Sequence, residues 1–192
     1  MRLPPIPPNS LTPEQQELYD DMAEVIASSF GDLIARRRDG ALIGPFNGWL
    51  HHPQFGSAAW ALNRSLWTNS TLPDGLHQLV ILVTAARFGA RYEIYGHEYF
   101  ARRAGLADRK IATIVAGERP PDLTDDEGVA YDTASALVRG GPLPESTYRA
   151  AQTRFGDSGV AEIVFLVGCF VMVAVTLNAF DASVPGRDET SD

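Results

Sequence analysis

The stretch Arg91-Tyr-Glu-Ile-Tyr-Gly-His-Glu-Tyr-Phe-Ala-Arg-Arg-Ala-Gly-Leu106 decides how this sequence is interpreted. It predicts a helix that stops near Gly105, because glycine is favoured just beyond a helix C-terminus. Glu93 and His97 are four residues apart, which places both side chains on one helix face. A histidine beside a carboxylate can exchange a proton near neutral pH. This pair is therefore the first candidate for chemistry.

Helical patterns extend on both sides of this stretch. Upstream, apolar residues recur at helical spacing from residue 73 or 74, so we expect one long helix up to residue 104, weakened at Gly89 and Gly96. Thr12 with Gln15, and Thr124 with Glu127, have the spacing of helix-capping residues. Further helices are expected over residues 13–29, 52–67, 108–116, 124–139, 144–155 and 158–180. Residues 36–49 contain glycines and a proline and are expected to form a loop.

No segment alternates as a strand does, so the sequence predicts an all-α fold. The chain of 192 residues suits a single domain, expected over residues 11–184. A proline-rich arm, residues 1–10, is expected to lie on the body or on a neighbouring subunit, and residues 185–192 to form a flexible tail. The apolar run from Ile163 to Leu177 is shorter than the roughly 20 residues of a membrane span, so a buried core helix is expected.

The charge and cysteine content narrow the function classes. A formal net charge of -8 argues against nucleic acid or an anionic membrane as the main partner. Cys169 is the only cysteine, so no intramolecular disulfide can form. This fits a reducing compartment, and we expect a cytoplasmic protein without a targeting segment.

The pattern Glu93-x-x-x-His-x-x-x-Ala-x-x-Ala-Gly-Leu106 resembles the core of the carboxymuconolactone decarboxylase family, within the AhpD-like superfamily. Residues 177–180, Leu-Asn-Ala-Phe, resemble the family's terminal stretch, while residues 11–14 and 44–50 resemble a subgroup of longer members. The resemblance implies a helical bundle of about six to eight helices that completes its core by oligomerising, as a trimer or a hexamer.

Two departures from the family pattern matter. AhpD-type peroxidases carry a Cys-x-x-Cys pair where this chain has Ala90 and Glu93. Disulfide exchange needs two thiols, which Cys169 alone cannot supply, so a hydroperoxide reductase is the least favoured class. The decarboxylases also carry a histidine in the last helix, where this chain has Leu166. The namesake substrate is therefore left open.

These observations favour a cofactor-free lyase, related to decarboxylases of aromatic compound catabolism. Its substrate would be a small carboxylated lactone or aromatic-derived acid. His97 would be the general acid and base, and Glu93 would orient it or share its proton. The alternative is a non-catalytic member of the family that binds a small molecule or scaffolds a partner.

Other side chains are candidates for substrate binding. Asn47 could hydrogen-bond a carbonyl or enolate, and Trp49 and Phe46 could cover a planar ring, but these rings could equally plug a loop onto the core. Arg87, like Arg91, could bind a carboxylate or could be solvated.

The remaining polar and aromatic residues near the motif favour no further role. Tyr92 and Tyr95 point away from the Glu93–His97 direction and are expected to pack. His97 has no second histidine at helical ligand spacing, and His51 and His52 could join it only through tertiary contact. No metal is expected.

Overall fold

The computed structural model describes residues 2–186, and they divide into two compact units. The first unit comprises residues up to Asn63 together with those from Thr176 onward, and the second comprises Arg64–Val175. Within the described residues there are eight α-helices and one 3-10 helix, and the β-structure is limited to an isolated bridge between Arg36 and Leu42. The all-α prediction is confirmed; the single domain over residues 11–184 stays a prediction.

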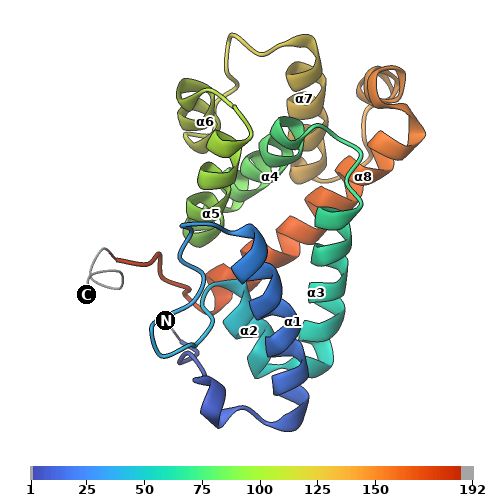
Figure 1. Cartoon of the computed structure of the whole chain (residues 1–192). Coiled ribbons are helices and arrows are strands. Elements are labelled where there is room, and N and C mark those ends of the chain that lie inside the picture. Colours follow the sequence, from blue (N-terminus) through green and yellow to red (C-terminus); the bar gives the residue numbers. More distant parts are fainter. Residues whose placement is uncertain (1, 187–192) are drawn as a thin grey trace. The chain divides into compact units, whose positions relative to one another are not determined.

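The first unit is built on α1 (Pro13–Ser29), α2 (Pro45–His51) and most of α3 (Pro53–Thr68) (Figure 1). The predicted capping box is present at the start of α1. Thr12 Oγ1 accepts a hydrogen bond from Gln15 N at 3.3 Å, and Gln15 Oε1 accepts one from Thr12 N at 2.9 Å. These two bonds satisfy amide groups that a helix start leaves without partners.

The expected loop over residues 36–49 is wrong at its C-terminal end, where Pro45 begins α2. Proline suits the first helical position because its missing N–H has no helical partner there, and Gly44, with a φ of 65°, makes the turn into the helix. Every residue from Pro45 to Leu50 is buried. This segment is therefore part of the core of the first unit.

The N-terminal arm lies on its own unit. The 3-10 helix η1 (Pro8–Ser10) follows an extended stretch in which Arg2 N donates to Phe180 O at 2.8 Å and Leu3 O accepts a bond from Asn47 at 3.1 Å. Of the expected flexible tail, residues 187–192 lie outside the described residues.

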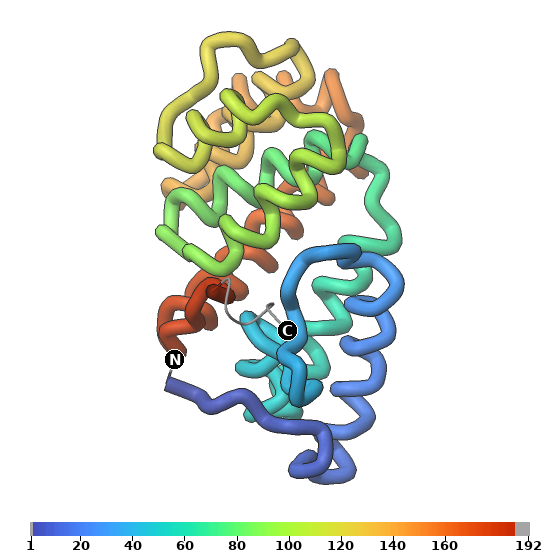
Figure 2. The backbone as a smooth tube through the Cα atoms, turned by 60° about the vertical axis from the view of Figure 1, so that its left-hand side comes forward, coloured from blue at the N-terminus to red at the C-terminus, as the bar shows by residue number. Residues whose placement is uncertain are grey.

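The second unit is organised around α4 (Asp74–Phe88), which packs against α5 (Arg91–Arg103), α6 (Asp108–Val115) and α7 (Asp125–Arg139). Figure 2 shows α4 and α5 side by side. The single long helix expected over this region is two helices, because Gly89 adopts a left-handed conformation (φ 60°, ψ 32°) and ends α4. All residues of α4 from Leu76 to Ala85 are buried, so α4 is the central helix of this unit.

The last helix, α8 (Glu145–Ala179), is interrupted at Gly156, whose backbone is non-helical (φ 67°, ψ 179°). Its two parts correspond to the two helices expected from the sequence. Among the described helices α8 alone is long and apolar enough to cross a membrane, and half of its most apolar window is buried. One such helix is weak evidence for a membrane span, since the core helix of a soluble protein passes the same test.

Candidate functional site

The Glu93–His97 pair lies on α5 in the second unit. The Glu93 side chain is only 3% exposed, while His97 is partly buried. Glu93 belongs to the first turn of the helix and His97 follows one turn later, as the sequence spacing predicted. The two groups are therefore held by the same rigid element.

Gln78 of α4 holds the imidazole of His97. His97 Nδ1 lies 2.8 Å from Gln78 Oε1, and because an amide oxygen can only accept, Nδ1 carries the proton of this bond. Nε2 is then the unprotonated nitrogen of the neutral ring. An orienting bond from Glu93 was expected instead, but neither of its carboxyl oxygens has a hydrogen-bond partner among the described residues. The hydrogen-bond partner of His97 in the structure is therefore Gln78, and the expected role of Glu93 stays a prediction.

Aromatic rings surround the imidazole. The Phe170 ring of α8 lies 4.9 Å from the His97 ring and almost perpendicular to it, and Phe100 of α5 lies 5.9 Å away. Trp67 in turn packs edge-on against Phe100 at 5.1 Å. An apolar setting of this kind strengthens electrostatic interactions and penalises charge.

Burial sets the protonation states of the pair. It lowers the pKa of His97 from 6.5 to about 3, with a smaller contribution from the nearby His77. Burial raises the pKa of Glu93 well above its usual value. Burial therefore favours the uncharged form of both groups, an unprotonated imidazole and a protonated carboxyl one helical turn apart.

Three expected substrate-binding residues lie in the first unit, on α2. The ring of Phe46 packs against Trp49 at 5.7 Å and against Trp60 at 6.0 Å, while Asn47 donates to Leu3 O. These contacts agree with the alternative role in packing: the two rings lie in the core, and the amide holds the N-terminal arm. A role of Phe46, Asn47 or Trp49 in binding substrate stays a prediction.

Arg87 is not brought to His97 through α4. It is exposed, and it follows Gln78 by nine residues, which is about half a turn around the helix. Its side chain therefore leaves α4 on the side opposite to Gln78. Tyr92 and Tyr95 pack against each other at 5.8 Å, in line with a packing role.

No metal centre is indicated in the part of the chain that the structure describes. It contains no group of three or more histidine, cysteine or acidic residues that could hold a metal ion. His51 lies 2.8 Å from Pro4 O through Nε2, and His52 stacks on Phe180. Both histidines therefore take part in contacts within the first unit.

The sequence reasoning missed His77, Gln78 and Glu162. His77 and Gln78 are 4% and 5% exposed, in a helix segment that is otherwise almost entirely apolar. That polar pair inside an apolar run is a signal that could have identified them, since buried polar side chains need partners. Glu162 lies just before the apolar run of α8, where it was taken only as the boundary of that run.

Comparison with known proteins identifies similar folds among solved structures. No family model matches the chain, and no curated protein matches it in sequence. A peroxidase-related protein from Ralstonia eutropha with an alkylhydroperoxidase AhpD core superposes with a TM-score of 0.74 at 15% identity, covering 98% of this chain and 93% of that one.

Two further structures are similar. The debrominase Bmp8, in complex with 2,3,4-tribromopyrrole, has a TM-score of 0.71 at 14% identity, covering 99% of this chain and 96% of the debrominase. A protein of unknown function from Agrobacterium tumefaciens, suggested to be an antioxidant defence protein AhpD, has a TM-score of 0.66 at 17% identity, with 73% and 97% covered. At these identities the likeness concerns the fold, and the chain has the fold of the AhpD-like proteins.

Proposed function

We propose that the second unit carries a cofactor-free acid–base centre of the lyase type, in which His97 exchanges a proton with a small planar acid or lactone. The observation that carries this proposal is the bond between Gln78 Oε1 and His97 Nδ1 at 2.8 Å. It fixes one tautomer and leaves Nε2 as the proton-accepting atom, on a partly buried residue whose ring contacts aromatic side chains.

The substrate itself would tune His97. In the absence of substrate, burial holds the pKa of His97 at about 3, so the imidazole is neutral. A substrate carboxylate in the same apolar surroundings raises this pKa, because an opposite charge nearby favours the protonated ring. His97 then takes a proton from solvent as the anion binds.

The reaction is a decarboxylation in its simplest form. The bond between the carboxylate and its carbon breaks, carbon dioxide leaves, and the electron pair remains on the carbon as an enolate-like carbanion. Nε2 of the imidazolium returns its proton to that carbon, and His97 becomes neutral again. Double-bond migration requires the same proton transfers without the loss of carbon dioxide.

Glu93 contributes as a neutral group. Its raised pKa favours the protonated, uncharged carboxyl, which repels an anionic substrate less than a carboxylate would. A protonated carboxyl can also share a proton with the imidazole, as the sequence reasoning expected. Its position on α5, one helical turn before His97, supports this role.

The fold comparisons support a small planar ligand. The debrominase of the same fold is known in complex with 2,3,4-tribromopyrrole, a small aromatic ring. A thiol-dependent reaction, as in the peroxidases, is not proposed, because Ala90 and Glu93 stand where the resemblance places the two cysteines and Cys169 is buried in α8.

The experiment is a screen of unsaturated lactone carboxylates and aromatic carboxylates, with carbon dioxide release and absorbance as readouts. His97→Gln is expected to abolish turnover while circular dichroism and assembly stay unchanged. Gln78→Leu is expected to lower kcat by roughly ten-fold or more, with a smaller change in KM, because the tautomer is no longer fixed.

Full activity of His97→Gln overturns the proposal. A ligand that binds without conversion, independently of His97, favours the non-catalytic alternative.

A further inference from the structure

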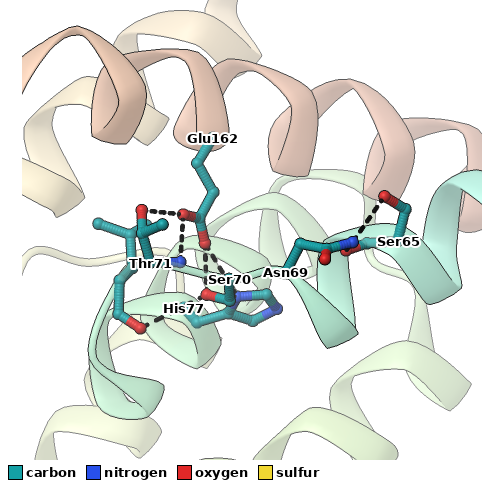
Figure 3. Close-up of polar contacts among 7 residues, drawn as sticks. Ser65, Asn69, Ser70, Thr71, His77 and Glu162 are labelled. Atoms are coloured by element: carbon teal, nitrogen blue, oxygen red, sulfur yellow. Dashed lines mark hydrogen bonds and ion pairs between the residues drawn. The ribbon is translucent and has the colours of Figure 1, made fainter.

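A second polar cluster lies in the same unit and is used by none of the steps above. It joins Glu162 of α8 to Ser70 and Thr71, in the segment between α3 and α4, and to His77 of α4 (Figure 3). Ser70 Oγ donates to Glu162 Oε1, while Thr71 N and Thr71 Oγ1 donate to Glu162 Oε2 at 2.8 and 2.7 Å.

The cluster runs from the surface to the interior. Thr71 is exposed, the Glu162 side chain is 9% exposed and the His77 side chain is 5% exposed. Ser70 lies between the last two, because its hydroxyl contacts Glu162 and also lies 3.0 Å from His77 Nδ1. A carboxylate, a hydroxyl and an imidazole are therefore connected in that order.

Glu162 and His77, the two ends of the cluster, are both able to accept a proton. Burial raises the pKa of Glu162, but the hydrogen bonds from Ser70 and Thr71 outweigh it and the pKa is lowered. Burial lowers the pKa of His77 more than the neighbouring Glu162 raises it. At neutral pH the carboxylate is ionised and the imidazole is neutral, so each end can accept a proton.

A cluster that only attached the segment before α4 to α8 would not need the contact between Ser70 and His77. The two bonds from Thr71 already attach the segment before α4 to α8, whereas the contact between Ser70 and His77 adds nothing to that attachment. The hydroxyl stands between a carboxylate and a buried imidazole, and a hydroxyl can donate and accept at once.

We propose that Glu162, Ser70 and His77 form a proton relay that brings protons from solvent to the interior of the second unit. For delivery, protonated Glu162 gives its proton to Ser70 Oγ while the Ser70 hydroxyl proton passes to His77 Nδ1. His77 keeps its Nε2 proton and becomes an imidazolium, so the delivered proton resides on its buried ring. Glu162 is again a carboxylate, and the resulting pattern, with Nδ1–H directed at Ser70 and the Ser70 hydroxyl at Glu162, fits the contacts observed.

The inner end of the relay lies beside the acid–base pair, and this part rests on the proposed function. His77 directly precedes Gln78, which holds His97. The Trp67 ring contacts both His77 at 6.5 Å and Phe100 at 5.1 Å, and Phe100 contacts the ring of His97. When His77 is protonated, its charge lowers the pKa of His97. A proton arriving at His77 is therefore close enough to influence His97.

The test needs no substrate. In protein labelled with ¹⁵N-histidine, the rate at which the His77 ring N–H exchanges with solvent is measured by NMR. Ser70→Ala removes the middle of the relay and is expected to slow exchange by roughly ten-fold or more. Ser70→Thr keeps the hydroxyl and should restore the rate. Thr71→Val is the matched control, because it removes a bond to the same carboxylate and leaves the relay intact.

The outcomes separate the relay from a clamp and from the proposed function. A clamp that merely opens would make exchange faster in both Ser70→Ala and Thr71→Val, and that result overturns the relay. Equal rates in the wild type and Ser70→Ala overturn it as well. Loss of turnover in His97→Gln tests the proposed function independently, so either proposal can fail while the other stands.

Discussion

At the scale of the residue, the buried carboxyl of Glu93 is the least satisfied group near the candidate site. Both of its oxygens are buried without a hydrogen-bond partner among the described residues. A buried polar group in this state costs on the order of 1–3 kcal/mol of stability. Proteins retain such a cost where a group serves something other than folding, which agrees with a neutral acid beside His97.

Replacing Glu93 by methionine should therefore stabilise the protein at pH 8. The pKa of Glu93 is higher in the folded state than its ordinary value of 4.5. Glu93 is therefore least destabilising below pH 4.5, and its cost to stability grows as the pH rises toward the pKa of the folded state. The gain of Glu93→Met, on the order of 1–3 kcal/mol at pH 8, should shrink toward pH 4. Urea unfolding at both pH values measures it.

Glu98→Met is the control on the same helix. Glu98 forms an ion pair with Arg102 at 3.2 Å in a partly exposed position, so its loss should change stability by less than about 1 kcal/mol at either pH. A destabilised Glu93→Met would mean that the Glu93 carboxyl has a partner in solution. A gain that does not depend on pH would mean that the pKa of Glu93 is not raised by folding.

The sequence identified the helix that carries the pair but not the hydrogen-bond partner of His97, which is Gln78. The spacing of Glu93 and His97 fixes a shared helix face, and this is a local property that sequence can show. The contact with Gln78 joins two helices across 19 residues, and its distance depends on how α4 and α5 pack. Periodicity carries no information on that packing.

At the scale of the element, helix starts were easier to predict than interruptions. Both capping boxes follow from residue types three positions apart, and both are present. The turn at Gly89 and the helix at Pro45 depend instead on whether a glycine adopts a positive φ and on which side of a proline the helix lies. At such positions a single sequence is compatible both with a continuing helix and with a break.

Gly156 is a testable case of this kind. Its backbone (φ 67°, ψ 179°) belongs to a region that residues with a Cβ avoid, so Gly156→Ala should destabilise the protein by about 1–3 kcal/mol. The alanine Cβ would meet no neighbour within 4 Å, so the cost is one of backbone conformation. Chemical denaturation with an unchanged m-value measures it.

Gly75→Ala provides the comparison. Gly75 lies in α4 with helical geometry, and an added Cβ would make an ordinary contact of 3.7 Å with Ala104 O. Alanine there should raise stability by up to about 1 kcal/mol. If Gly156→Ala were stabilising in the same way, α8 would be a continuous helix through residue 156.

At the scale of the whole molecule, α8 leaves an apolar stripe exposed. Val164, Phe165 and Val175 are 42%, 59% and 52% exposed, and Gly168 shares their helix face. Apolar side chains that follow one face of a helix in this way mark an interaction surface more often than isolated exposed residues do. The stripe is therefore expected to be covered in solution.

We propose that another copy of this chain covers the stripe, as the resemblance to trimeric and hexameric proteins implies. Phe165→Glu places a charge in the middle of the stripe. It also removes a phenylalanine side chain whose burial at each contact would stabilise the oligomer by about 1.5–3 kcal/mol. It should shift the mass measured by analytical ultracentrifugation toward the monomer. Phe55→Glu is the matched control, since Phe55 is 72% exposed and belongs to α3 in the first unit, whereas the stripe belongs to α8 in the second. A wild-type protein that sediments as a monomer would show that no oligomer forms. An oligomer of equal mass for Phe165→Glu and the wild type would show that the oligomer contact lies elsewhere.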